Sequence, residues 1–133
     1  MNRKRTLAVA VASASLAALA ALPLAALAQQ RTVTRVGAVA KPKSHIGHCP
    51  ATIDFIGTIH VSHHPVRVEY EWERSDGARS ERRTVDIRSA ARGVSDRWTL
   101  GQRGERTNVW ERLHVLAPTG ISSPEAHAHV DCR

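Results

Sequence analysis

The sequence predicts an all-β domain, an antiparallel β-sandwich of six or seven strands, and three observations support this fold class. Apolar and polar residues alternate over several stretches, which is the period of a strand with one buried face. Turn-forming residues separate these stretches. No segment of the expected mature chain shows the 3.6-residue period of an amphipathic helix. The length of 133 residues allows one domain and excludes large multidomain enzymes.

Residues 1–28 are typical of a secretory signal peptide. Met1–Arg5 contains three basic residues, and the uncharged stretch that follows is mostly Ala, Leu and Val. It ends in Ala26-Leu27-Ala28, small residues of the kind that a signal peptidase recognises, so we expect cleavage after Ala28. The alternative is an uncleaved membrane anchor, because about 20 apolar residues can span a bilayer. Alanine richness, Pro23 and the Ala-x-Ala ending favour cleavage. We therefore expect a secreted or periplasmic protein with no membrane span after cleavage.

Residues 29–48 are predicted to form a flexible basic leader. The segment contains no acidic residue, and its basic residues are Arg31, Arg35, Lys41 and Lys43. Its valines follow no sustained period, and Lys41-Pro42-Lys43-Ser44 interrupts any regular element. We expect this leader to contact anionic polymers of the cell envelope.

The excess positive charge lies outside the predicted domain, residues 49–133. The whole chain has 19 Lys and Arg against 12 Asp and Glu, a formal net charge of +7. The predicted domain contains 12 Arg and 12 acidic residues and is formally neutral. Binding to nucleic acid is therefore not expected, because it requires a basic surface.

The clearest strand signals lie between Cys49 and the middle of the chain. Alternation is strict from Cys49 to Ser62, apart from Ile56, and continues from Val66 to Glu73. Ser75-Asp76-Gly77-Ala78 then predicts a tight hairpin turn, since Asp-Gly suits the positive φ values of such a turn. With Asp76 and Gly77 as the loop, the expected cross-strand pairs are Val68–Val85, Val66–Ile87, Arg67–Asp86 and Glu71–Arg82.

Shorter strands are expected around Val94–Leu100, Val109–Val115 and Ala126–Cys132. In the last of these, the small and apolar residues share one face, and His127, His129 and Asp131 share the other. Short strands separated by turns at this spacing indicate an immunoglobulin-like architecture.

Several motifs also resemble a known module. They are Cys49-Pro50-Ala51-Thr52-Ile53-Asp54-Phe55-Ile56-Gly57-Thr58-Ile59, Tyr70-Glu71-Trp72-Glu73-Arg74-Ser75-Asp76-Gly77-Ala78, Trp98-Thr99-Leu100-Gly101 and Trp110-Glu111-Arg112-Leu113-His114-Val115-Leu116-Ala117-Pro118. Together with Cys132 they resemble an immunoglobulin-like β-sandwich module of secreted and surface-attached bacterial proteins. The resemblance implies a module without catalytic residues. The chain differs from antibody-type domains because its cysteines lie at the two ends of the domain.

Cys49 and Cys132 are the only cysteines, and they are expected to form one structural disulfide. An even pair in an exported protein is typical of a disulfide, and two cysteines allow a single intramolecular pairing. The loop-closure entropy of so long a loop corresponds to about 4.5 kcal/mol of stabilisation. The alternative, a redox or metal-binding thiol pair, lacks Cys-x-x-Cys spacing.

Histidine is the candidate for metal binding, with eight residues in the chain. His127-x-His129 places two imidazoles on one strand face, a spacing found in metal sites on β-sheets. If the first and last strands lie side by side, Asp54 faces His127 and could complete a zinc or copper site. The alternative is that all three are ordinary solvent-facing residues, which we favour.

Trp110 lies out of phase with Val109, Leu113 and Val115. If it is exposed beside Arg112, it could anchor a glycan or a protein partner. A bulge before Leu113 would instead turn Trp110 into the core. We favour the core position, because a domain with five aromatic residues rarely leaves one outside.

The sequence favours a non-catalytic function. Nucleophile-elbow spacing, a Gly-rich oxyanion loop and a phosphate-binding Gly motif are all missing. The expected function is a secreted binding or envelope-associated module, whose partner is an envelope polymer or a protein. The alternatives are a periplasmic metal-binding protein that uses His127 and His129, and a small secreted enzyme inhibitor that uses the loop Gly101–Arg106.

Overall fold

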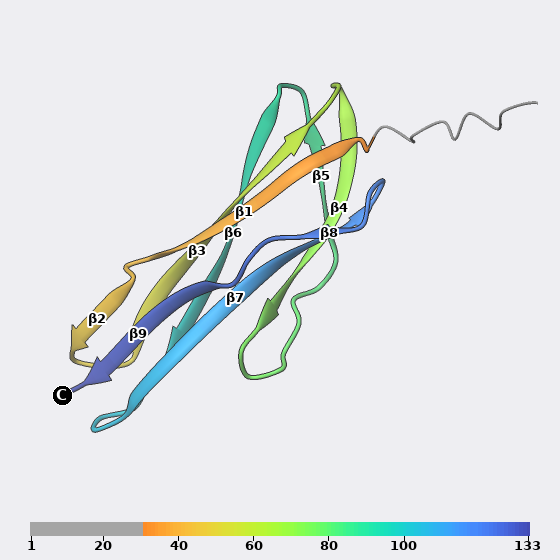
Figure 1. The fold of residues 1–133 in the computed structure, drawn as a ribbon. Helices are drawn as coiled ribbons and strands as arrows, with labels where there is room; N and C mark the ends of the chain where they lie inside the picture. The colour runs from red at the N-terminus through yellow and green to blue at the C-terminus, as the bar shows by residue number, and fades with distance from the viewer. Residues whose placement is uncertain (1–30) are drawn as a thin grey trace, which may run out of the picture.

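The computed structural model describes residues 31–133, and every regular element in this part of the chain is a strand (Figure 1). The predicted signal peptide and its cleavage site lie outside the described residues. The strands are β1 Val33–Lys41, β2 Ser44–Gly47, β3 Ala51–Val61, β4 Val66–Arg74, β5 Arg83–Ile87, β6 Ala91–Leu100, β7 Arg106–Ala117, β8 Ile121–Ser122 and β9 Ala126–Cys132. Within residues 31–133, no helix is long and apolar enough to cross a membrane.

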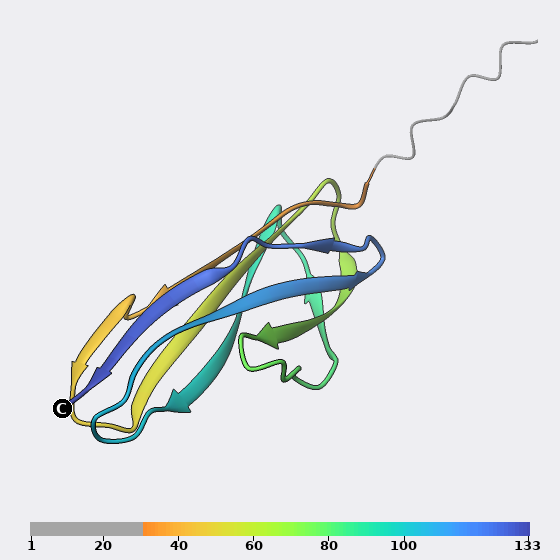
Figure 2. The same ribbon diagram turned by 60° about the horizontal axis from the view of Figure 1, so that its bottom comes forward.

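The strands form two sheets that pack as a β-sandwich. Sheet A has the order β1-β3-β6, and sheet B has the order β2-β9-β7-β4-β5, with β8 attached to β7 (Figure 2). All pairs are antiparallel except β2 with β9, which is parallel. The core between the sheets is apolar, and its largest fully buried side chains include Trp72, Phe55, Ile53, Ile59 and Leu113.

Close packing of the two sheets depends on a glycine. A Cβ atom at Gly57 on β3 would lie 2.5 Å from Leu113 Cδ2 and 3.1 Å from Trp72 Cη2. These distances leave no room for a side chain, so Gly57 lets the indole of Trp72 lie against the backbone of the facing sheet.

The alternating segments predicted from the sequence are strands. Ala51, Ile53, Phe55 and Ile59 of β3 all face the core. The hairpin register is confirmed, because Val68 pairs with Val85, Val66 with Ile87 and Arg67 with Asp86.

One predicted pair, Glu71–Arg82, is wrong. Glu73 pairs with Arg79 at the hairpin end, whereas Tyr70 pairs with Arg83, so the register shifts by one residue between these positions. As a result, Glu71 forms an ion pair with Arg79, and Arg82 contacts Glu69 instead. Such a shift leaves an unpaired residue in one strand, which alternation alone does not reveal.

The prediction of a flexible leader over residues 29–48 is also wrong for the described part of this segment. Residues 33–41 form β1 at the edge of sheet A, and residues 44–47 form β2 at the edge of sheet B. The pairing of β1 with β3 is irregular between Val33 and Arg35, which breaks the spacing of its buried residues Val33, Val36 and Ala40. Pro42 does interrupt the regular structure, because it lies where the chain crosses from one sheet to the other. The folded unit therefore begins before Cys49.

Candidate binding surface

Four of the residues singled out from the sequence lie together on the outer face of sheet B. Trp110 pairs with His127 across β7 and β9, and Asn108 pairs with His129 in the same ladder. Arg112 follows Trp110 on the same face of β7. We call this group the Trp110 surface, which consists of Asn108, Trp110, Arg112, Glu125, His127 and His129.

A carboxylate fixes the arrangement around Trp110. Arg112 Nη2 donates to Glu125 Oε1 at 2.7 Å, and His127 Nε2 lies 3.1 Å from Glu125 Oε2. The Arg112 guanidinium also lies over the indole of Trp110, 5.4 Å from the ring centre. A cation in this position is attracted by the electron-rich ring face. The aromatic ring and its polar neighbours are therefore held by contacts with one another.

The favoured core position of Trp110 is wrong, because its side chain is partly exposed on the outer face. The pairing of β7 with β9 is regular from Arg106 to Glu111, so no bulge turns the indole inward. The inward position next to it is filled by Glu111, whose side chain is fully buried. Trp110 lies beside Arg112 on the outer face, as in the alternative, but it is only partly exposed.

The predicted grouping of Asp54 with the two histidines is wrong as well. Asp54 lies on β3 in sheet A, where it pairs with Lys41 and Arg97, and its carboxylate accepts from Arg97 Nε at 2.8 Å. His129 Nδ1 contacts Asn108 Oδ1 at 2.8 Å instead. Among residues 31–133, no group of three or more His, Cys, Asp and Glu could hold a metal ion.

Cys49 and Cys132 form a disulfide, with Cα atoms 5.4 Å apart. The bridge ties the β2–β3 connection to the end of β9. The β2–β3 connection lies close to the C-terminus (Figure 2). Gly101 passes close to it with a φ of 96°, and a Cβ there would lie 2.7 Å from Cys132 Sγ. Both the positive φ and the contact require glycine at this position.

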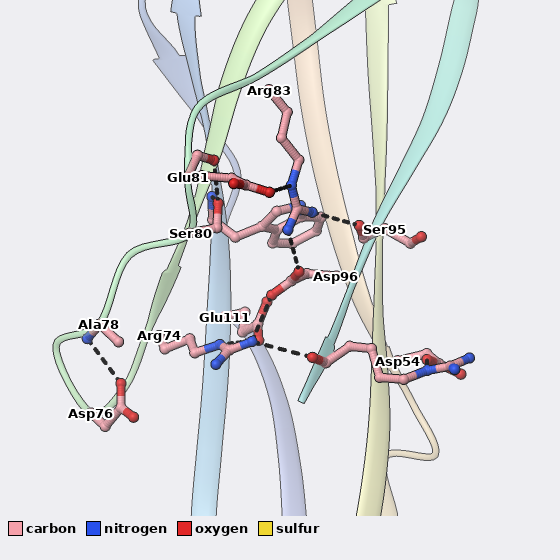
Figure 3. A network of polar contacts seen from close by, with 12 residues as sticks. Asp54, Arg74, Asp76, Ala78, Ser80, Glu81, Arg83, Ser95, Asp96 and Glu111 are labelled. Atoms are coloured by element: carbon pink, nitrogen blue, oxygen red, sulfur yellow. Dashed lines mark hydrogen bonds and ion pairs between the residues drawn. The ribbon is translucent and has the colours of Figure 1, made fainter. Parts of the chain in front are cut away.

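A second polar group lies between the sheets and was not expected from the sequence. Arg74 donates to Asp96 at 2.9 Å and to Glu111 at 3.1 Å, and Arg83 donates to Asp96 at 3.1 Å (Figure 3). We call these four residues the buried cluster. They come from β4, β5, β6 and β7, so the cluster joins β6 of sheet A to sheet B.

The two arginines also cover the edge of β6. Arg74 Nη2 donates to the carbonyl of Arg97 at 3.2 Å, and Arg83 Nη1 donates to that of Ser95 at 3.3 Å. The Arg74 guanidinium lies over Trp98, 5.1 Å from the ring centre. Edge strands with free backbone groups invite pairing with other chains, and these contacts reduce that risk.

Glu111 is the member of the buried cluster whose carboxylate is incompletely hydrogen bonded. Its Oε1 accepts from Arg74, whereas its Oε2 is buried without a hydrogen-bond partner among the described residues. Burial and the nearby negative charge of Asp96 raise the pKa of Glu111 to about 7. The cluster therefore joins the sheets, but it keeps a carboxyl group that is costly to ionise.

The sequence did contain a signal for this cluster. Asp96 is in phase with Val94 and Trp98, and Glu111 is in phase with Val109 and Leu113. A charged residue on the core face of a strand requires a buried partner of opposite charge. Two acidic residues in such positions, on different strands, therefore indicate a basic residue that pairs with both.

No protein-family model matches the chain, and a search of curated proteins found no similar sequence. The resemblance of the strand motifs to a bacterial immunoglobulin-like module therefore stays a prediction.

Proposed function

We propose that the protein is an exported, immunoglobulin-like, non-catalytic binding module that holds an envelope glycan on the Trp110 surface. The observation that carries the proposal is a partly exposed tryptophan on the outer face of a sheet, held beside hydrogen-bonding groups. Tryptophan combines a large apolar ring with a polar N–H, which suits it to interfaces where one side is apolar and the other hydrated.

The order of the strands supports the immunoglobulin-like part of the proposal. In constant-type immunoglobulin domains one sheet contains the first, second, fourth and fifth strands, and the other contains the third, sixth and seventh. Strands β1, β3 and β6 match the first, second and fifth strands of this scheme, and β4, β7 and β9 match the third, sixth and seventh. The strand β5 differs, because it lies beside β4 in the second sheet. Trp72 on β4 is fully buried, at the place where immunoglobulin domains keep a core tryptophan. The position of the disulfide differs from that of antibody domains.

The disulfide also supports export. Disulfides persist in the periplasm and outside the cell and are rare in the cytosol. Together with residues 1–28, the Cys49–Cys132 bridge favours an extracytoplasmic protein. We expect protein recovered from the cell envelope to begin at Gln29, which intact-mass measurement would check. A mature protein that retains residues 1–28 would contradict this expectation.

The chemistry of the Trp110 surface favours a neutral, hydroxyl-rich ligand. Its charges are internally paired, because Glu125 contacts both Arg112 and His127. An ionic ligand would have to displace these contacts. A sugar ring can instead place its apolar face against the indole and hydrogen bond to the flanking side chains. A bacterial envelope offers such rings in its peptidoglycan.

Co-sedimentation with purified peptidoglycan sacculi tests the proposal. The full mature protein is expected to sediment with the sacculi, and Trp110→Ala is expected to weaken binding by about tenfold or more. Arg97→Ala is the matched control, since Arg97 is exposed on the other sheet and should leave binding unchanged. Equal binding of the Trp110→Ala variant would contradict the proposal. Failure of the wild-type protein to sediment with the sacculi would also contradict it. This result would include the case in which Trp110 binds an envelope protein and no glycan.

A further inference from the structure

Glu73, His114 and Ser122 form a hydrogen-bonded relay on the outer face of sheet B. The Nδ1 atom of His114 contacts the hydroxyl of Ser122, and its Nε2 atom contacts the carboxylate of Glu73. His114 and Glu73 are largely shielded, with 17% and 24% of their side chains exposed, whereas Ser122 is exposed. An accessible hydroxyl thus lies at one end of the relay.

Strand pairing on both sides of β7 builds this arrangement. His114 pairs directly with Ser122 of β8 on one side and with Glu71 of β4 on the other. Glu73 lies two residues from Glu71 on the same face, so its side chain reaches His114 diagonally. The three groups are therefore positioned by regular backbone pairing.

The charges around the relay favour one arrangement of protons. The hydrogen bond from His114, together with the charges of Arg79 and Arg112, lowers the pKa of Glu73 and favours its ionised form. An ionised carboxylate only accepts hydrogen bonds, so Nε2 of His114 donates to it. The other ring nitrogen of a neutral imidazole is then an acceptor, and it can take the hydroxyl hydrogen of Ser122.

We propose that Ser122 is an activated nucleophile and accepts an acyl group from activated esters. As the Ser122 oxygen attacks the ester carbonyl, its proton passes to Nδ1 of His114. The bond from the carbonyl carbon to the leaving oxygen then breaks, and that oxygen takes the proton from His114. The products are an ester on Ser122 and the free alcohol or phenol. Glu73 acts as a positioning residue that fixes the imidazole and stabilises its positive charge.

Acylation is expected to occur at one site per chain. Ser122 is the serine that His114 contacts, so one acyl group is taken up at a time. Once the alcohol has left, His114 is neutral again and can activate water against the ester, so slow hydrolysis is expected to follow. Ser122 is thus a site of covalent acylation, and this proposal does not depend on glycan binding at Trp110.

The chain contains a natural control for this site. Ser62 contacts Nδ1 of its neighbour His63 at 3.1 Å and is also exposed. Within residues 31–133, His63 makes no ion pair or hydrogen bond with a carboxylate. The two sites share a serine and a histidine. Ser62 differs in lacking the acid and in donating its hydroxyl to the carbonyl of Thr32 at 3.3 Å.

Treatment of the folded mature protein with p-nitrophenyl acetate, followed by peptide mass mapping, tests the proposal. One acetyl group is expected on Ser122, and it should appear about a hundredfold faster than any on Ser62. Ser122→Ala should abolish the label, and His114→Gln should slow it to the rate of Ser62. Glu73→Gln should slow it by about tenfold or more. Circular dichroism of each variant would show whether it is folded.

Two results would overturn the proposal. One is equal acetylation of Ser62 and Ser122 in the wild-type protein. The other is acetylation of the folded Ser122→Ala variant at the same rate and to the same extent as the wild-type protein. This result would show that another residue is the acceptor.

Discussion

The buried cluster and the outer face of sheet B contain the same kinds of side chain in different surroundings. In the buried cluster, Glu111 is fully buried and Asp96 is nearly so, and both depend on Arg74. On the outer face, Arg67 pairs with Asp86 while both side chains remain largely in water. The cluster is costly to disturb because an unpaired charge would stay away from solvent. The outer pairs contribute little to stability, since water replaces a lost partner.

This difference separates structural from functional residues in the protein. The carboxylates that join the two sheets, Asp96 and Glu111, cannot be exposed to a ligand without opening the fold. The side chains of the Trp110 surface can exchange partners at little cost in folding free energy. We therefore expect stability to depend on the buried cluster and binding to depend on the outer face.

Substitution of Arg74 by Met is expected to have the largest effect on stability. It removes the common partner of Asp96 and Glu111 and keeps most of the side-chain volume. We expect the free energy of unfolding to fall by about 4 kcal/mol at pH above 7, where Glu111 is mostly ionised. Urea denaturation would measure it, with Arg97→Met as the exposed control. Similar urea midpoints for Arg74→Met and Arg97→Met would contradict the claim that the buried cluster contributes more to stability than exposed ion pairs.

The pH dependence of stability is expected to report on Glu111. Its pKa rises from an ordinary value of 4.5 to about 7, so between these pH values the folded state holds a proton that the unfolded state has lost. This contribution to stability is fully present below about pH 4.5 and is lost as the pH rises to about 7. We expect a loss of about 2 kcal/mol, because water near the partly exposed arginines weakens the effect.

Glu111→Gln should flatten this dependence, because an amide does not titrate. Denaturation of both proteins across the same pH range provides the comparison, and the difference between them isolates Glu111 from the other carboxylates. Parallel curves for the wild type and the variant would show that Glu111 does not titrate in this range.

Removal of an outer ion pair is expected to have a much smaller effect. Arg67→Ala leaves Asp86 exposed to water, so its denaturation midpoint should equal that of the wild type within error. Asp86 loses its hydrogen bond from Arg67, the main cause of its lowered pKa, so its pKa should return toward the ordinary value. Carboxyl titration by NMR would detect this change. A clear loss of stability would show that outer pairs also hold the fold.

Zinc is expected to have no effect on the protein. His127 and His129 lack a third ligand among residues 31–133, and Glu125 and Asn108 occupy one nitrogen of each. Calorimetric titration should show no saturable binding at one ion per chain. Saturable uptake that disappears in a His127→Ala/His129→Ala variant would favour the metal-binding alternative.

Local patterns predicted much of the fold, and contacts between distant segments account for most of the errors. Alternation identified β3, β4 and β9, because the apolar residues of each lie on one face, apart from Ile56 of β3. The neighbour of β9 is β7 and not β3, which no local pattern reveals, and this choice separated Asp54 from the histidines. The β1 strand was missed because an irregular pairing breaks its period. The Trp110 surface could be predicted in part, since its residues are in phase on two strands that turned out to be neighbours.

The three tryptophans allow a direct test of the central claim that Trp110 holds the ligand. Trp72 lies in the core, Trp98 lies under Arg74, and Trp110 lies on the outer face. Each indole N–H gives its own signal in a ¹⁵N–¹H NMR spectrum of the mature protein. On titration with soluble peptidoglycan fragments, we predict that the Trp110 signal shifts in a saturable way while the Trp72 and Trp98 signals stay in place. Shifts confined to Trp98, or no shift at saturating fragment, would contradict the claim.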